Sequence, residues 1–153
     1  PKRQQIETTP SEINEEEIKT ALTSSDERVT NCRVLFAESS RPVLLVAFNK
    51  TAPNEPVEFI RSFLADEQWT NIAIVVVLES QVDLQNNSTV LWKLFNNLDP
   101  KRDFLREGDR FGIDLSRKLK EEGYKQDWPE EIIMSEEIRS QVDQRWSTLF
   151  PND

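Results

Sequence analysis

The chain has 153 residues, of which 37% are hydrophobic and 31% are charged, and its formal net charge is −9. This length suits about one folded domain, and a field of this sign repels nucleic-acid phosphates and anionic lipid surfaces. Histidine is absent, and the sequence has one cysteine and three glycines. These counts exclude a zinc site, a Ser-His or Cys-His nucleophile pair and a glycine-rich phosphate loop within this chain.

The single cysteine, Cys32, cannot close a disulfide within the chain, and no apolar run reaches 18 residues or resembles a signal peptide. We therefore expect a cytoplasmic protein with no membrane span. Because free cysteine is usually small, buried and inert, we expect Cys32 to lie inside a strand. The chain begins at Pro1 rather than at methionine. Either an initiator methionine was removed or the chain is a fragment of a larger intracellular protein. The start does not decide between the two, but a fragment fits the missing catalytic chemistry.

The N-terminal segment predicts a linker followed by a capped helix. Residues 1–10 are polar and bracketed by prolines, which predicts a leader or linker. We expect one α/β domain over residues 11–153. Asn14 followed by Glu17 has the spacing of a capping box, and the acidic first turn suits the positive end of a helix dipole.

The next segments alternate between strand and helix patterns. A polar turn at 24–30 precedes a predicted strand at 33–37, and residues 43–48 predict a central strand because they are apolar throughout. Asn54 predicts the cap of an amphipathic helix. Residues 72–78 read IAIVVVL, which predicts a strand covered on both faces.

The C-terminal half predicts two helices around an irregular region. Ser88 predicts the cap of a helix that ends at Asn97, and residues 104–128 are the least regular part of the sequence. A short extended piece at 132–134 precedes Ser135, the predicted cap of the last helix. The apolar residues of that helix fall at helical spacing: Ile138, Val142, Trp146 and Leu149. The alternation predicts an α/β fold of one domain, with a mainly parallel or mixed sheet flanked by helices.

Residues 90–103 read VLWKLFNNLDPKRD and form the most distinctive stretch. They resemble the V-[IL]-W-A-…-[RN]-x-D-P-x-R-D segment of UbiD-like decarboxylases. Three later segments match in the same order: GIDLS at 112–116 resembles G-[IL]-D-A-T, WPEE at 128–131 resembles W-P-x-x-I, and VDQRW at 142–146 resembles the closing V-D-x-x-W helix. Upstream, LLVAFNK at 44–50 resembles a strand that ends in an active-site lysine. The resemblance covers roughly residues 40 to 148, and shared order and spacing carry it.

The resemblance implies the C-terminal domain of a 3-polyprenyl-4-hydroxybenzoate or menaquinone-pathway carboxy-lyase. Such enzymes decarboxylate aromatic or polyprenylated hydroxybenzoate-type acids in quinone biosynthesis, with prenylated FMN, a divalent metal and a potassium ion. The family's catalytic Glu-Arg-Glu set and its Asn, His and Glu metal ligands lie in the preceding flavin-binding domain. This chain would then carry no catalytic and no metal-binding residue. It would cap the active site and form a homo-oligomer, expected to be a dimer, through the last helix with Trp146.

Lys50 is the one residue that the resemblance assigns to the cofactor, because it matches a lysine that contacts the flavin phosphate. Its place after a central strand suits a ligand site, although a solvated loop charge is the alternative. The family often continues with R-Y-P-G-H, whereas residues 51–55 read TAPNE. The family's D-D-D-[VI] is replaced at 78–83, and the loop before the G-[IL]-D motif is shortened to 106–111. These departures keep a second function open, a stand-alone protein-binding or assembly module on the same fold.

The remaining charged clusters have local structural explanations. We expect Asp99, Arg102 and Asp103 to fix a helix-to-strand turn through hydrogen bonds and ion pairs. We expect Asp114 to be a cap or turn residue. The KLKEE segment at 118–122 predicts a solvated face.

Overall fold

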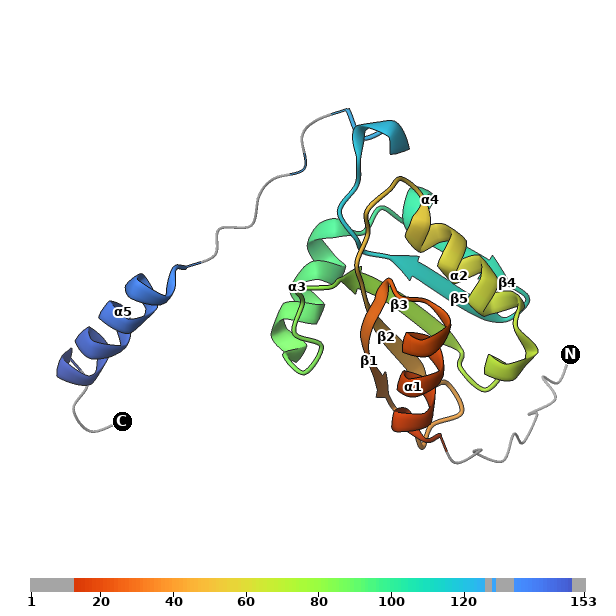
Figure 1. The fold of residues 1–153 in the computed structure, drawn as a ribbon, viewed down its shortest axis with the longest axis horizontal. Coiled ribbons are helices and arrows are strands. Elements are labelled where there is room, and N and C mark those ends of the chain that lie inside the picture. The colour runs from red at the N-terminus through yellow and green to blue at the C-terminus, as the bar shows by residue number, and fades with distance from the viewer. Residues whose placement is uncertain (1–12, 126–127, 129–133, 150–153) are drawn as a thin grey trace, which may run out of the picture.

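A computed structural model describes residues 13–125, 128 and 134–149 (Figure 1). Its elements in chain order are α1 (Glu15–Ser25), β1 (Val29–Leu35), β2 (Val43–Phe48), α2 (Glu55–Ala65), the 3-10 turn η1 (Glu67–Trp69), β3 (Ile74–Glu79), α3 (Asn87–Asn97), α4 (Pro100–Asp103), β4 (Phe104–Glu107), β5 (Arg110–Asp114), the 3-10 turn η2 (Lys120–Glu122) and α5 (Glu136–Leu149). None of the helices in this part of the chain is both long and apolar enough to cross a bilayer.

The five described strands form one mixed sheet in the order β1-β2-β3-β5-β4. The three inner strands, β2, β3 and β5, are parallel to one another, and the two edge strands are antiparallel to their neighbours. This arrangement confirms the predicted α/β class with a mixed sheet.

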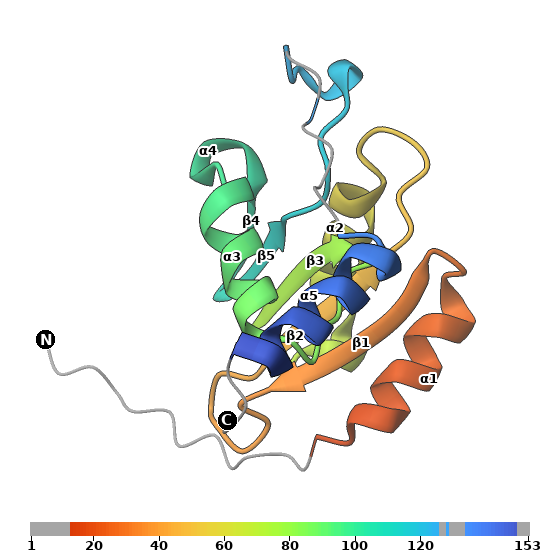
Figure 2. The same cartoon turned by 90° about the vertical axis from the view of Figure 1, so that its left-hand side faces the viewer.

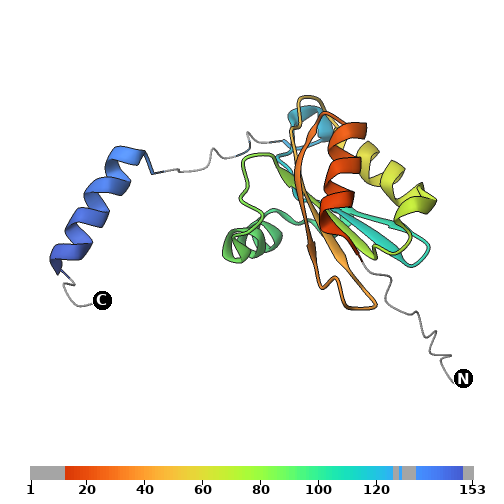
Figure 3. The same ribbon diagram turned by 60° about the horizontal axis from the view of Figure 1, so that its bottom comes forward.

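Helices cover the two faces of the sheet unequally. Figures 2 and 3 show α1 and α2 on one side and α3 on the other. The core under α1 and α2 contains Leu44, Val46, Val75 and Val77 from the inner strands. The alternate residues of the same strands point to α3, where they form a second core: Leu45, Ala47, Val76 and Leu78. Because a strand buried on both faces has no polar alternation, the continuous apolar runs in the sequence are explained.

The first edge strand begins earlier and ends earlier than the sequence predicts. Val29 is buried at 3% exposure and pairs with Phe48, so the polar turn before β1 is shorter than 24–30. The strand ends at Leu35 because Phe36 has a left-handed φ of 56°. Cys32 lies buried in β1, as expected, and desolvation raises the pKa of its thiol to about 11.

Two of the predicted helix caps are corrected. The third helix begins at Asn87, and the side chain of Asn86, not Ser88, accepts from the Thr89 N–H at 3.1 Å. Asn54 does occupy the cap position of α2, but its φ is 64° and its side chain makes no capping bond. The carboxylate of Glu55 binds the N–H groups of the preceding loop instead.

Other predictions are confirmed, corrected or lie outside the described residues. The Asn14 side chain accepts from the N–H groups of Glu16 and Glu17, and the Ser135 hydroxyl accepts from the Ile138 N–H at 3.3 Å. The prediction of irregular structure at 104–128 is wrong for its first part, where β4 and β5 form an antiparallel hairpin. The linker at 1–10 and most of the extended piece at 132–134 fall outside the described residues.

A close approach between α2 and β5 depends on Gly112. A Cβ at this position would overlap the Cγ2 atom of Ile60 and lie 3.3 Å from Ile60 Cβ. Next to it in β5, the Arg110 guanidinium donates to four carbonyl oxygens around the end of α2: Phe63, Leu64, Trp69 and Ile72. This side chain therefore satisfies carbonyl groups that the helix end would otherwise leave without donors.

We predict that Gly112→Ala lowers the free energy of unfolding by about 1–3 kcal/mol, because the added methyl overpacks the α2–β5 contact. Urea denaturation measures the change. Ile60→Leu removes the Cγ2 methyl that the added methyl would meet. The double variant should therefore lose less free energy of unfolding than the sum of the losses of the two single variants. A Gly112→Ala midpoint equal to that of the parent would contradict this explanation.

Candidate functional site

The carboxyl ends of β2 and β3 form a topological switch point. The loop after β2 leads to α2 on one face of the sheet, whereas the loop after β3 leads to α3 on the opposite face (Figure 3). In open α/β sheets, ligands bind where the connections diverge in this way. Lys50 follows β2 by two residues and Glu79 ends β3, so both lie at this point.

Three lysines gather at this carboxyl edge of the sheet, and each is held by a carboxylate. Lys50 binds Glu122 after β2, Lys93 of α3 binds Glu79 at the end of β3 at 2.7 Å, and Lys118 binds Asp114 at the end of β5. The side chains of Lys93 and Lys118 are each only 3% exposed. Burying an ammonium group is costly unless an opposite charge and further acceptors surround it, so these pairs set the structure of the edge.

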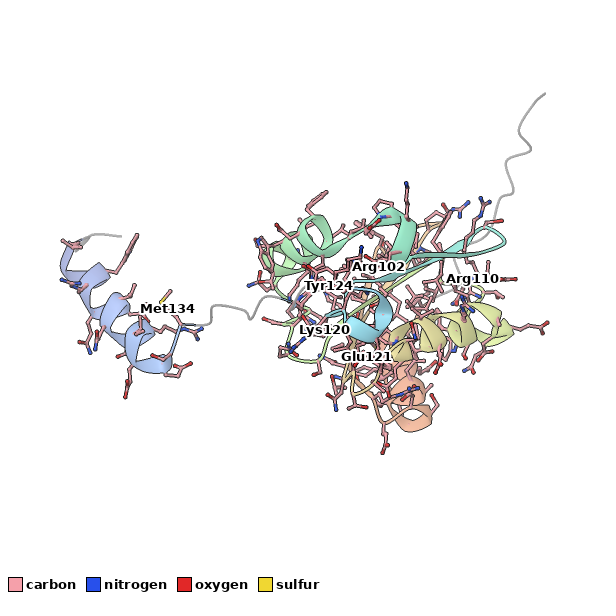
Figure 4. The ribbon with its side chains drawn as sticks, turned by 90° about the horizontal axis from the view of Figure 1, so that it is seen from above. Arg102, Arg110, Lys120, Glu121, Tyr124 and Met134 are labelled. Atoms are coloured by element: carbon pink, nitrogen blue, oxygen red, sulfur yellow. The ribbon has the colours of Figure 1, made fainter. Side chains whose placement is uncertain are left out.

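The structure places Lys50 in a closed ion pair. Its Nζ donates to the two carboxylate oxygens of Glu122 at 2.6 and 2.7 Å and to the Arg117 carbonyl at 2.7 Å. Both side chains are 6% exposed. The predicted solvated face at 118–122 is therefore wrong at Lys118 and Glu122, because these two side chains point inward to buried partners. Lys120 and Glu121 between them are exposed, and Figure 4 labels both at η2.

Glu122 accepts hydrogen bonds from several donors, as an ionised carboxylate does. Besides Lys50, the N–H groups of Asn54 and Leu119 donate to it at 2.8 and 2.7 Å. Burial acts to raise the pKa of Glu122, but the hydrogen bonds from Lys50, Leu119 and Asn54 outweigh it, and the pKa falls below its ordinary value. The Lys50 site thus already holds a carboxylate. A ligand phosphate could bind Lys50 Nζ only if Glu122 shared or left that position.

The second buried group surrounds Lys118. Its Nζ lies 2.6 Å from Asp114 Oδ2 and 3.4 Å from Asp103 Oδ1, and both aspartates are 1% exposed. The Ser116 hydroxyl donates to Asp114 Oδ1 at 2.6 Å. Asp114 is therefore a turn residue, as expected, and it also carries one side of a buried ion network.

Arg102 connects this network to the surface. Its guanidinium binds both carboxylate oxygens of Asp103 at 2.6 and 2.7 Å, and Asp103 accepts from the Asp99 N–H at 2.7 Å. These contacts confirm that the three residues fix the turn between α3 and β4. Arg102 also lies 5.9 Å from the ring centre of Tyr124, and Figure 4 shows the two side by side.

Sequence reasoning singled out Lys50, Asp114 and Asp103 but missed Lys93, Lys118 and Glu122. A lysine four residues after Asp114 was the available signal, but the same spacing is common on solvated surfaces. The described residues contain no group of three histidine, cysteine or acidic side chains placed to hold a metal ion. The carboxyl edge of the sheet therefore carries lysine–carboxylate pairs that hold its loops in place.

Comparison with known proteins identifies the family. The sequence model of the 3-octaprenyl-4-hydroxybenzoate carboxy-lyase C-terminal domain matches residues 11–125. An uncharacterized protein of Aquifex aeolicus is 35% identical over 91 residues, covering 49% of this chain and 19% of that protein. One from Helicobacter pylori J99 is 26% identical over 129 residues, covering 84% of this chain and 21% of that protein. The chain thus spans about a fifth of the length of these curated relatives.

Solved structures share the fold. The vanillic acid decarboxylase of Sedimentibacter hydroxybenzoicus in its open form superposes with a TM-score of 0.65 at 12% identity, covering 90% of this chain and 32% of that one. An evolved dimeric form of the UbiD-class enzyme HmfF from Pelotomaculum thermopropionicum, in complex with prFMN, gives a TM-score of 0.64 at 18% identity, covering 85% of this chain and 29% of that one.

We predict that Lys118→Met lowers the free energy of unfolding by about 3–5 kcal/mol, because it leaves two buried aspartates facing each other without their ammonium partner. Lys101→Met removes the same charge from an exposed position of α4 and serves as the matched control. Its midpoint in urea should stay near that of the parent. Equal effects of the two substitutions would contradict a buried network.

We predict that Glu122→Gln lowers stability at neutral pH by about 1–3 kcal/mol, because Lys50 loses its charged partner. A carboxylate with a lowered pKa stabilises the fold above its ordinary pKa of 4.5, and this contribution is lost as pH falls through the lower folded value. The difference between parent and variant should therefore shrink below that pH. Thermal melts across the acid range measure it, with the exposed neighbour Glu121→Gln as control.

Proposed function

The chain belongs to the C-terminal domain family of 3-octaprenyl-4-hydroxybenzoate carboxy-lyases, and on this premise we propose that it caps and oligomerises a prenylated-FMN-dependent decarboxylase. The parent enzyme would act on aromatic or polyprenylated hydroxybenzoate-type acids in quinone biosynthesis. The observation that carries this proposal is the family match over residues 11–125, on a fold shared with UbiD-class decarboxylases. The catalytic acid and the metal ligands would come from the preceding flavin-binding domain.

The residues at the switch point fit the phosphate of the flavin. Lys50 Nζ and the Asn54 N–H converge on a single anionic group, the Glu122 carboxylate. A flavin phosphate has the same charge sign and the same need for donors, so it could replace this carboxylate. We assign Lys50 a supporting contact to the phosphate, and we assign the ring to the partner domain.

The last helix supports the proposed role in oligomerisation. Three apolar side chains of α5 are strongly exposed, with Ile138 at 51%, Trp146 at 58% and Leu149 at 71%. A stripe of large apolar side chains on a helix surface is typical of a surface that is covered in an assembly. Among the described elements this helix is the strongest candidate for an interface.

Reading the coding sequence upstream of Pro1 tests the proposal. We expect several hundred codons that specify a flavin-binding domain, including an Asn, His and Glu metal set and a Glu-Arg-Glu set. Deleting those codons should abolish decarboxylation of aromatic acids in cell extracts. A reading frame that opens at or just before Pro1 would contradict the proposal and favour a separate assembly module on the same fold.

A further inference from the structure

The loop between β2 and α2 directs its backbone donors at carboxylates. The N–H groups of Thr51 and Ala52 donate to Glu55 at 2.7 and 2.8 Å. The Asn54 N–H donates to Glu122 at 2.8 Å, and the residue between Ala52 and Asn54 is a proline, which has no N–H. Successive N–H groups that converge from a loop form a concave site for anions. The stretch from Thr51 to Asn54 therefore binds negative charge with every backbone donor that it has.

The two carboxylates at this loop come from different parts of the chain. Glu55 is the first residue of α2, next to the loop in sequence, and its carboxylate lies 3.5 Å from the Arg28 guanidinium, which balances its charge. Glu122 belongs to η2 and reaches the loop from a separate segment. The Lys50 ammonium pairs with Glu122 at 2.6 Å. The loop and its lysine thus form an anion site that η2 fills.

The Glu122 carboxylate occupies the position that a small anionic ligand would take. Both of its oxygens accept from Lys50 Nζ, one of them also accepts from the Asn54 N–H, and its side chain is 6% exposed. A phosphate monoester carries a charge of about −1.5 to −2 at neutral pH and has three strong acceptor oxygens. Hydrogen bonds between ionised partners are the strong ones, so the same donors suit a phosphate at least as well as a carboxylate.

The segment that supplies Glu122 carries part of its hydrogen bonding with it. We call residues 119–123 the strap. Within the strap, the Leu119 N–H donates to the Glu122 carboxylate at 2.7 Å. If the strap leaves the loop, Glu122 loses its bonds to Lys50 and Asn54 and keeps this internal donor. Lys50 and Asn54 are then available to another anion.

The two ends of the strap allow this movement without disturbing the buried core. Just before the strap, the Lys118 side chain is anchored at 2.6 Å to Asp114 at the end of β5. The Arg117 carbonyl, which accepts from Lys50 at 2.7 Å, lies outside the strap and stays with the lysine. The strap ends at Gly123, which has a left-handed φ of 84° that favours glycine. The strap is therefore bounded by a buried anchor and a permissive backbone position.

We propose that Glu122 is an internal competitor for a phosphate monoester at Lys50, so that binding of the phosphate displaces Glu122 and releases the strap. The proposal rests on the proposed contact of Lys50 with the flavin phosphate and adds the residue that controls access to it. A competitor tied to the same chain acts at an effective concentration on the order of millimolar or above. Phosphate shifts the equilibrium because it binds only the form in which Glu122 has left the site.

Titration of FMN into the 153-residue chain, followed by flavin fluorescence anisotropy, tests the competition. If Glu122 fills the site nine-tenths of the time, the apparent dissociation constant is raised about tenfold. Glu122→Gln should therefore tighten FMN binding at least tenfold, and adding Lys50→Met should remove the gain. Glu121→Gln removes the same charge from an exposed neighbour and should leave the affinity near that of the parent. Equal affinities of parent and Glu122→Gln, or no detectable binding by either, would overturn the proposal.

Two further ligands identify the group that the site recognises. Riboflavin lacks the phosphate and should bind parent and Glu122→Gln equally, whereas inorganic phosphate should compete with FMN for the variant. A gain that riboflavin shares would assign the effect to the ring and overturn the proposal. A tenfold gain for inorganic phosphate without a gain for FMN would support the competition and overturn the flavin as the source of the phosphate.

Hydrogen exchange of the parent chain distinguishes displacement from simultaneous binding and needs no substitution. At saturating phosphate the amides of the strap should exchange several-fold faster than in chloride of the same ionic strength, because η2 has left the loop. The Asn54 amide should stay protected, because phosphate replaces Glu122 as its acceptor. Slower exchange of the strap in phosphate would show that both anions share Lys50 and would overturn displacement.

These outcomes are separable from failure of the proposed function. An upstream coding sequence without a flavin-binding domain would contradict the decarboxylase role, but the gain of Glu122→Gln for inorganic phosphate would still support the competition. Conversely, an upstream flavin-binding domain together with unchanged affinity of Glu122→Gln would overturn the competition and leave the decarboxylase role standing.

Discussion

The architecture depends on the need to cover both faces of two fully apolar strands. In β2 and β3 nearly every residue is buried, and Leu44, Val46, Val75 and Val77 are each 0% exposed. Strands of this kind are stable only between two layers, so the chain must send helices to both sides. The loop after β2 goes one way and the loop after β3 goes the other. The switch point at their carboxyl ends is a direct consequence of that division.

The same division determines how charge is distributed. Because the loops leave on opposite faces, they leave the carboxyl ends of the strands uncovered. In this chain, lysines paired with carboxylates lie at those strand ends. Lys118 with Asp114 and Asp103 is nearly as buried as the apolar core, at 4% exposure or less. Such a pair adds little net stability over an apolar packing of the same volume, but losing one partner is costly. It therefore makes the conformation of the edge specific, and the Lys50–Glu122 pair extends that edge to η2.

The apolar pattern of the sequence predicted the strands whose formation depends on burial. It did not predict which of several suitable polar residues caps a helix or which charged side chains are buried. Residues 43–48 and the core of 72–78 are strands because their pattern admits no solvated face. The cap of α3 was assigned to Ser88, whereas Asn86 takes it, because both residue types suit a cap and only the loop path decides. The inward turn of Lys118 and Glu122 was not predictable from a segment of alternating charges, since its partners lie in β5, α4 and the loop after β2.

The residues of the matched motifs have structural roles in this chain. Gly112 is required by the side chain of Ile60, Asp114 holds Lys118 and Ser116, and Asp103 holds Arg102. These residues preserve the carboxyl edge and the hairpin. Lys50, which we propose as a contact to the flavin phosphate, is paired here with Glu122. The sequence motifs therefore identify the family through the fold of this domain.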